Sequence, residues 1–212
     1  MTKVLILGAS GRIARHVVGA LVDDDAFDTS LLLRDSSRLS KSDTGNMAVI
    51  EGDVLDSAIL DGAMAGQDIV YANLTGEDID DQAKAVIAAM QKAGVKRLIF
   101  IASLGIYDEV PGAFGEWNNA IIGEDLKPFR RAADAIEASD LDYTIVRPAW
   151  LTDADEVDFE LTQRDEPFKG TEISRKSVAA YVLEILRDPA TASRGNIGID
   201  KPGTDGDKPA FM

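Results

Sequence analysis

The 212-residue sequence contains no cysteine and only one histidine, His16. Without cysteine the chain forms no disulfide and has no thiol nucleophile, and it does not offer the ligand set of a structural zinc site. His16 falls inside a predicted helix, where we expect it to pack or to face solvent rather than act as a general base. We therefore predict no metal site and no thiol chemistry.

Long apolar runs and an excess of positive charge are also missing. No segment approaches the roughly 18 consecutive apolar residues of a membrane-spanning helix, and the first residues lack the apolar region of a signal peptide. The net charge of −15, from 22 basic and 37 acidic residues, argues against direct nucleic-acid binding, which needs a basic surface. We expect a cytoplasmic protein that binds neither a membrane nor nucleic acid directly.

Short β-rich runs alternate with helical patterns along the chain. The expected strands are 3–7, 30–33, 47–50, 68–72, 97–102, 143–146 and 196–199, and the clearest helices are 12–22, 81–92 and 174–187. Most of the strands are near-continuous apolar runs, as in sheets covered on both faces. Strand–helix alternation builds parallel sheets. The pattern predicts one α/β domain over residues 1–212, with a doubly wound parallel sheet.

Two segments interrupt the alternation. Residues 105–128, GIYDEVPGAFGEWNNAIIGEDLKP, follow the fifth predicted strand and are rich in glycine and aromatic residues. Residues 152–173 are the second, and are expected to form a small hairpin-like flap on the substrate side. Long insertions after strand ends shape the ligand crevice in open α/β sheets. We interpret both as crevice loops, with plain surface loops as the alternative.

A glycine turn connects the first predicted strand to the first helix, in VLILGASGRIAR (4–15). Gly8, Gly11 and Ala14 have the spacing G-x-x-G-x-x-A. Gly8 lets the backbone leave the strand sharply, Gly11 lets a pyrophosphate approach the main chain, and Ala14 lets the helix pack closely on the sheet. The turn predicts a Rossmann-like dinucleotide site.

The first helical turn would hold the phosphates of that dinucleotide. Its free backbone amides, including that of Ile13, face the ligand and are aided by the helix dipole. The dipole contributes only about 0.3–1 kcal/mol per nearby charge at exposed sites. Direct hydrogen bonds must supply most of the affinity, and Ser10 and Arg12 are the side-chain candidates.

The end of the second predicted strand indicates which dinucleotide binds. NAD-selective sites place an acidic residue there to bind the ribose hydroxyls. Here LLLRDSSR (31–38) places Arg34 at that point, with Arg38 just beyond. A guanidinium can pair with a 2′-phosphate, so NADP(H) is favoured. Asp35 follows immediately, which leaves NAD(H) possible, and a solvated charge at the strand end is the alternative role for Arg34.

With these motifs, the chain resembles an atypical short-chain dehydrogenase/reductase of the NmrA-like, NAD(P)H-binding group, from residue 3 to about residue 200. The resemblance also uses EGDVLD (51–56), KRLIFIASLGIY (96–107), SDLDYTIVRPAWL (139–151) and ISRKSVA (173–179). It implies that Asp53 and Val54 flank the adenine, and that the fourth strand's end, with Asn73 and Leu74, passes beneath the cofactor. The predicted cofactor-binding residues are Gly8, Ser10, Gly11, Arg12, Ile13, Arg34, Asp53, Val54, Asn73, Leu74, Ala102 and Ser103.

The family's catalytic device is a serine with a Tyr-x-x-x-Lys pair, in which the tyrosine transfers the proton. Ser103 matches the serine, and Tyr107 follows four residues later. The region where the Tyr-x-x-x-Lys pair belongs, GEDLKPFRRAADAIEAS (123–139), contains no tyrosine. Lys127 and Arg130 are nearby cations, but neither completes the pair. Ser103 and Tyr107 are therefore the catalytic candidates, and the usual proton donor is missing.

That absence leaves three interpretations of function. The leading one is an NADPH-binding oxidoreductase that passes a hydride to a small acceptor, such as a quinone or flavin, which stabilises its own charge. The second is a non-catalytic NAD(P) redox sensor of the NmrA type, for which a protein partner is expected. The third is a sugar-nucleotide epimerase or dehydratase, disfavoured because such chains normally keep the tyrosine and have a larger C-terminal substrate domain.

Overall fold

Eight strands form one twisted sheet in the computed structural model, which describes all of residues 1–212. Across the sheet their order is β3 (Ala48–Glu51), β2 (Phe27–Leu33), β1 (Thr2–Leu7), β4 (Ile69–Ala72), β5 (Arg97–Ile101), β6 (Asp142–Pro148), β10 (Gly195–Asp200) and β8 (Glu160–Thr162). All neighbours pair in parallel except β8, which runs antiparallel to β10. All seven expected strands are present, and the predicted α/β fold with a doubly wound parallel sheet is confirmed.

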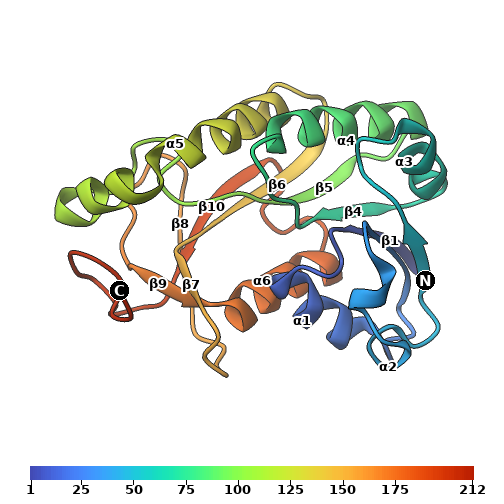
Figure 1. Cartoon of the computed structure of the whole chain (residues 1–212), viewed down its shortest axis with the longest axis horizontal. Helices are drawn as coiled ribbons and strands as arrows, with labels where there is room; N and C mark the ends of the chain where they lie inside the picture. The colour runs from blue at the N-terminus through green and yellow to red at the C-terminus, as the bar shows by residue number, and fades with distance from the viewer.

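Helices cover both faces of this sheet (Figure 1). One layer contains α3 (Ser57–Met64), α4 (Ile79–Ala93) and α5 (Gly112–Glu137); the other contains α1 (Arg12–Leu21), the short α2 (Lys41–Thr44) and α6 (Arg175–Arg187). A 3-10 turn, η1 (Ser36–Arg38), follows β2. None of the helices combines the length and apolar character needed to cross a bilayer.

Each face of the sheet carries its own apolar core, because successive side chains of a strand point to opposite faces. In β1, Val4 and Ile6 pack with α1 and α6, whereas Leu5 and Leu7 pack with α3, α4 and α5. All four are fully buried. This two-sided burial explains why the strands read as continuous apolar runs, and it fixes the carboxyl ends of β1, β4 and β5 along one edge.

The segment 105–128 is not a loop throughout. From Gly112 it is the first half of α5, a 26-residue helix that contains Pro128. Glycine and proline both disfavour helices in isolation, but tertiary packing stabilises α5 despite them. A side chain at position 115 would lie 2.1 Å from the carbonyl oxygen of Val110, so Gly115 allows the helix to start against the preceding turn. Only 105–111 remain as a connection.

The segment 152–173 does not form the expected hairpin-like flap. Strand β8 joins the edge of the main sheet, while β7 (Trp150–Thr152) and β9 (Glu172–Ser174) pair with each other in parallel. Parallel strands cannot form a hairpin, because their connection must cross back along the sheet. The segment is therefore a two-strand extension beside the carboxyl end of β6.

Asp200, at the end of β10, is a fully buried carboxyl group. Its Oδ2 accepts a hydrogen bond from the amide of Gly170 at 2.9 Å, but its Oδ1 has no partner. Burial raises the pKa of Asp200 to about 6, from an ordinary value of 3.8. The folded state therefore binds a proton that the unfolded state releases at lower pH.

We expect the free energy of unfolding to fall as the pH rises from about 4 through 6. Asp200→Asn should remove this part of its pH dependence. Each pKa unit corresponds to about 1.4 kcal/mol, so the wild type should lose up to about 3 kcal/mol through this group. Denaturant unfolding at pH 4.5, 6 and 7.5 measures the effect. The exposed Asp28→Asn serves as the control. Parallel pH profiles for the wild type and Asp200→Asn would contradict the assignment.

Candidate functional site

The glycine turn lies where the strand order of the sheet reverses, between β1 and β4. Open α/β sheets bind ligands at such switch points. Gly8 has a φ of +71°, a conformation that favours glycine, and a Cβ there would lie 2.2 Å from the carbonyl oxygen of Asn73. The amide of Gly11 donates to the carbonyl of Gly8 at 2.9 Å. The sequence thus forces a tight turn directly at the switch point.

This turn leaves several backbone donors without acceptors. The amides of Ser10, Arg12, Ile13 and Ala14 donate to no protein group, and the first bonded amide of the helix is that of Arg15, to Gly11 at 2.9 Å. The first turn of α1 contains no acidic residue, and Gly11 offers no side-chain cap. Free amides at a helix N-terminus form a site for an anion.

A cleft runs from this turn across the ends of β2 and β4; we name it the glycine-turn cleft. The predicted residues that line it are Gly8, Ser10, Gly11, Arg34, Asp53, Val54, Asn73 and Leu74, and the others are Leu32, Leu33, Asp35, Arg38, Gly52, Thr75, Asp78 and Gln82. Sequence motifs from four separate segments therefore meet in one cavity. Such convergence is what a ligand longer than a single phosphate requires.

Two cations without protein partners lie at the β2 end of the cleft. Arg34 and Arg38 line it, and neither side chain forms an ion pair or hydrogen bond. The neighbouring Asp35 is engaged, because its Oδ1 accepts from the hydroxyl of Ser37 at 2.6 Å and from its amide at 3.1 Å. Hydrogen bonds from Ser37 hold the pKa of Asp35 below its ordinary value. This end of the cleft therefore holds two guanidinium groups that form no ion pair, beside one hydrogen-bonded carboxylate.

Asn73 forms the floor of the cleft beneath the glycine turn. Its Oδ1 accepts a hydrogen bond from the hydroxyl of the buried Tyr71 at 3.3 Å, which directs its Nδ2 toward Gly11. A Cβ on Gly11 would lie 2.1 Å from this nitrogen. Burial raises the pKa of Tyr71, so its hydroxyl stays a proton donor and holds Asn73 in this orientation.

Asp78 and Gln82 were not predicted as site residues. Gln82 donates to the carbonyl of Thr75 at 3.1 Å and to Asp78 Oδ1 at 2.7 Å, and this fixes the turn between β4 and α4 against the cleft. A local signal existed, because an aspartate before a helix with a glutamine four residues later suits such a turn. The signal is common, and only the fold places it at the cleft.

Arg12 and Ile13 have other side-chain roles. The Arg12 side chain leaves the cleft and pairs with Asp153, and that of Ile13 packs in the core. Both residues still offer their backbone amides. Only the side-chain role expected of Arg12 differs from the structure.

Ala102 and Ser103 lie in a second cavity of about 210 Å³, the β5–β6 pocket. Its other residues are Ile101, Leu104, Ile122, Pro148, Ala149, Trp150 and Leu151. Ser103 is the only side chain with a hydroxyl among them, and this hydroxyl has no protein partner. The wall from α5 is Ile122, and one turn later Leu126 is buried. The one residue of α5 that lines this pocket is therefore apolar and offers no acid.

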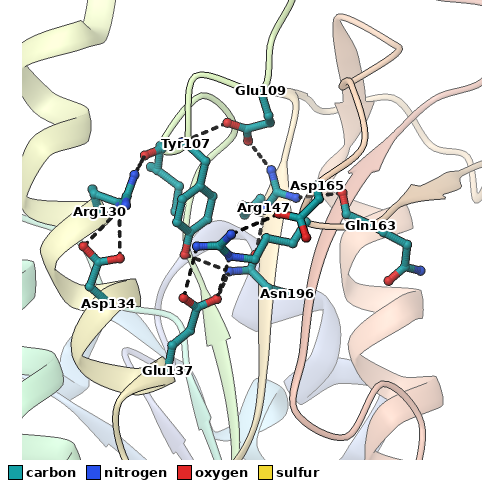
Figure 2. A network of polar contacts seen from close by, with 11 residues as sticks. Tyr107, Glu109, Arg130, Asp134, Glu137, Arg147, Gln163, Asp165 and Asn196 are labelled. Atoms are coloured by element: carbon teal, nitrogen blue, oxygen red, sulfur yellow. Dashed lines mark hydrogen bonds and ion pairs between the residues drawn. The ribbon is translucent and has the colours of Figure 1, made fainter.

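Tyr107 does not reach either cavity. Its hydroxyl accepts a hydrogen bond from Asn196 Nδ2 at 2.8 Å, and Arg130 lies over its ring at 4.5 Å from the centroid. Figure 2 shows this network, in which Glu137 also receives a hydrogen bond from Asn196. Burial and the Glu137 carboxylate raise the pKa of Tyr107. The structure therefore places the Tyr107 hydroxyl in this polar network and outside both the glycine-turn cleft and the β5–β6 pocket.

Arg147 is also structural rather than part of the site. It is fully buried, pairs with Glu109, and donates to Asn196 Oδ1 at 2.8 Å (Figure 2). Glu109 in turn accepts from the amides of Gly105 and Tyr107 at 3.0 and 2.9 Å. A buried charge pair of this kind is strongly destabilised when one partner is removed. The network anchors the turn after β5, and so indirectly Ser103.

Comparison with known proteins agrees with this geometry. The model of the NAD(P)H-binding family matches residues 8–189. A Rossmann-fold NAD(P)-binding family protein from Shigella flexneri is 57% identical, with a TM-score of 0.87 over 100% of both chains. A short-chain dehydrogenase/reductase from Veillonella parvula, solved in complex with NADP, is 26% identical, with a TM-score of 0.93 over 99% of both chains. The Bacillus subtilis protein named uncharacterized sugar epimerase YhfK is 30% identical over 218 residues, 91% of each chain.

The family match covers most of the chain, including the glycine turn, the strand ends around the cleft and the segment of Ser103. Family members of this kind bind a nicotinamide dinucleotide, which fits a cleft with free amides at one helix N-terminus. The resemblance inferred from the motifs is confirmed: the chain belongs to the NAD(P)H-binding family, within the NmrA-like group of atypical short-chain dehydrogenases/reductases.

Proposed function

We propose that the protein is an NADPH-dependent reductase that passes a hydride to a small planar acceptor, such as a quinone or flavin. The observation that carries the proposal is the pairing of two cavities along one edge of the sheet. The glycine-turn cleft lies at the ends of β1, β2 and β4, and the β5–β6 pocket lies at the ends of the next two strands. A dinucleotide that spans this edge would bring its nicotinamide toward Ser103.

The residues of the cleft have separate tasks in this proposal. The four free amides at the start of α1 bind the diphosphate, and Arg34 with Arg38 binds the 2′-phosphate that distinguishes NADP from NAD. Asp53 and Val54, which line the same cleft, flank the adenine. NADP(H) is therefore the preferred cofactor, and NAD(H) is the weaker ligand.

The β5–β6 pocket limits the acceptor. A bound reduced nicotinamide supplies a hydride, and an unactivated ketone would then need an acid for its developing alkoxide. Ile122, the residue of α5 that lines the pocket, cannot supply this acid. A quinone or flavin delocalises the added charge and can take its proton from water. Ser103 orients the acceptor's carbonyl by donating a hydrogen bond, and Trp150 offers an aromatic surface.

The same geometry argues against epimerase chemistry, although the Bacillus subtilis relative carries that name. Oxidation of a sugar hydroxyl requires a base to remove its proton as the hydride leaves. The α5 wall of the pocket has none, and Tyr107 is held elsewhere by Asn196. A redox sensor needs no proton transfer. The experiment must therefore distinguish a sensor from a reductase.

Ser103→Ala tests the proposal. A panel of quinones, flavins and aldehydes is mixed with NADPH and the protein, and loss of NADPH absorbance is followed. We expect turnover with quinones or flavins, and a fall in kcat/KM of about 2- to 12-fold in Ser103→Ala, the effect of one neutral hydrogen bond of about 0.5–1.5 kcal/mol. Titration of each variant with NADPH separates a loss of turnover from a loss of cofactor binding, and Ser103→Thr, which keeps the hydroxyl, should retain activity.

Tight NADPH binding without turnover on any acceptor would contradict the reductase and favour the sensor. In that case the expected finding is a protein partner whose binding differs between NADPH and NADP⁺. Turnover with sugar nucleotides alone would favour the epimerase.

A further inference from the structure

The carboxylate of Asp153 joins the start of α1 to the start of α6. It forms an ion pair with Arg12, the first residue of α1, and its Oδ1 accepts from Arg175 Nη1 at 2.9 Å. Arg175 also donates to the carbonyl of Leu151 at 3.3 Å. The Arg175 side chain is 14% exposed and that of Arg12 is 63% exposed. Arg175 therefore fixes Asp153, and Arg12 is the partner that is free to move.

Arg12 is divided between two surfaces. Its amide is one of the unpaired donors at the start of α1, and its guanidinium is turned away to Asp153. A dinucleotide places its negatively charged diphosphate on that first helical turn. The Asp153 carboxylate and the diphosphate are thus two anions within reach of one guanidinium.

The diphosphate is the stronger competitor. An ion pair between exposed side chains contributes little, because water screens both charges and two long side chains must be ordered. A phosphate can accept two parallel hydrogen bonds from one guanidinium, and the free amides already hold it at the turn. Binding of the cofactor is therefore sufficient to draw Arg12 away from Asp153.

Asp153 also lies next to the wall of the second cavity. It directly follows β7, whose residues Trp150 and Leu151 line the β5–β6 pocket. Release of Asp153 from Arg12 removes one of the two ion pairs that its carboxylate forms. Movement of Arg12 at the glycine turn would thus alter the wall of the β5–β6 pocket, which Ser103 also lines.

We propose that Asp153 is a positioning residue that stands in for the cofactor's diphosphate by holding Arg12, and that its displacement couples cofactor binding to the wall of the β5–β6 pocket. The proposal depends on dinucleotide binding, which is a property of the family, and not on the reductase activity proposed above. Its tests therefore measure binding and local exchange without turnover.

Asp153→Asn tests the competition, and Asp155→Asn is the matched control. Asp155 lies on the same segment and pairs with Lys176 at 2.6 Å, without contacting Arg12. In titration calorimetry, Asp153→Asn should bind NADP⁺ about two- to fivefold more tightly, the size expected when an exposed ion pair no longer competes. NAD⁺ should tighten equally, since both carry the diphosphate, and Asp155→Asn should match the wild type.

The Arg12→Gln background shows whether the effect passes through Arg12. In that background Asp153→Asn should leave the affinity for NADP⁺ unchanged, because the guanidinium for which Asp153 and the diphosphate compete is gone. Weaker binding in Asp153→Asn, or an equal gain in the Arg12→Gln background, would overturn the proposal. Absence of turnover in any variant would bear on the reductase alone.

Hydrogen exchange measures the coupling to the pocket. On addition of NADP⁺ to the wild-type protein, amides in residues 151–158 should exchange faster, and this gain should vanish in Arg12→Gln. Slower exchange in the wild type would mean that the segment closes onto the cofactor, which would also overturn the proposal.

Discussion

Replacement of Arg34 by alanine is expected to lower the affinity for NADPH about 10- to 150-fold and to leave that for NADH nearly unchanged. The 2′-phosphate is the only charged difference between the two cofactors, and a hydrogen bond to a charged group contributes about 1.5–3 kcal/mol. In the protein, Arg34 lines the glycine-turn cleft and has no partner to release first. Fluorescence or calorimetric titration with both cofactors measures the ratio of affinities.

The neighbouring residues explain why one arginine can have so large an effect in a chain with a net charge of −15. Asp35, which would otherwise favour ribose hydroxyls, is turned to Ser37. Ser36 and its amide are bound to Glu51, so that carboxylate is also engaged. The guanidinium groups of Arg34 and Arg38 therefore line the cleft without forming an ion pair, beside the carboxylate of Asp35, which is hydrogen-bonded to Ser37.

Arg187→Ala is the matched control, because it changes the net charge equally but lies at the far end of α6. It tests whether the loss in Arg34→Ala comes from the long-range field of the protein or from contact with the phosphate. Similar losses in both variants would contradict the contact. So would equal affinities of the wild-type protein for NADH and NADPH.

The order of strands and helices could be predicted because its signals are local. Continuous apolar runs such as 98–102 identify strands that are buried on both faces. The capping Ser174 marks the start of α6, where its side chain accepts from the amide of Ser177. The glycine turn likewise combines a strand end, a helix start and two glycines within eight residues. These patterns contain enough information to place the cleft at the edge of the sheet.

Helix α5 could not be predicted across 112–128, because its local composition opposes a helix. Gly112, Gly115 and Gly123 each disfavour helical structure, and Pro128 removes a backbone donor. The helix is stabilised by contacts distant in sequence, among them the packing of Leu126 in the core shared with α4. Tertiary packing of this kind leaves no trace in a window of neighbouring residues.

Side-chain roles were the least predictable part of the site. Arg12 was expected on the phosphates because it follows the second glycine, but its partner Asp153 lies 141 residues further along the chain. Tyr107 was a candidate for proton transfer because it follows Ser103 by four residues, yet its hydroxyl accepts a hydrogen bond from Asn196, 89 residues away. Spacing along the sequence fixes which backbone segments converge, and the direction of each side chain depends on partners that only the fold reveals.

Gly11→Ala is expected to reduce the affinity for either cofactor at least about 100-fold. The φ of Gly11 is −63°, so alanine can adopt this backbone conformation, and the effect must come from the added methyl group. That group would lie 2.1 Å from Asn73 Nδ2 and between the diphosphate and the main chain. Loss of two hydrogen bonds to a charged ligand, at about 1.5–3 kcal/mol each, accounts for this magnitude.

A double variant separates the steric effect on the fold from that on the ligand. In the Asn73→Ala background the methyl group no longer meets the amide, so Gly11→Ala should lower the free energy of unfolding less than it does in the wild type. Cofactor affinity should stay low, because the methyl group still keeps the phosphates from the amides. Gly19→Ala is the control within the same helix, since a Cβ there meets nothing within 4 Å. If Gly11→Ala and Gly19→Ala bound the cofactors with equal affinity, the prediction that a diphosphate closely approaches this turn would be wrong.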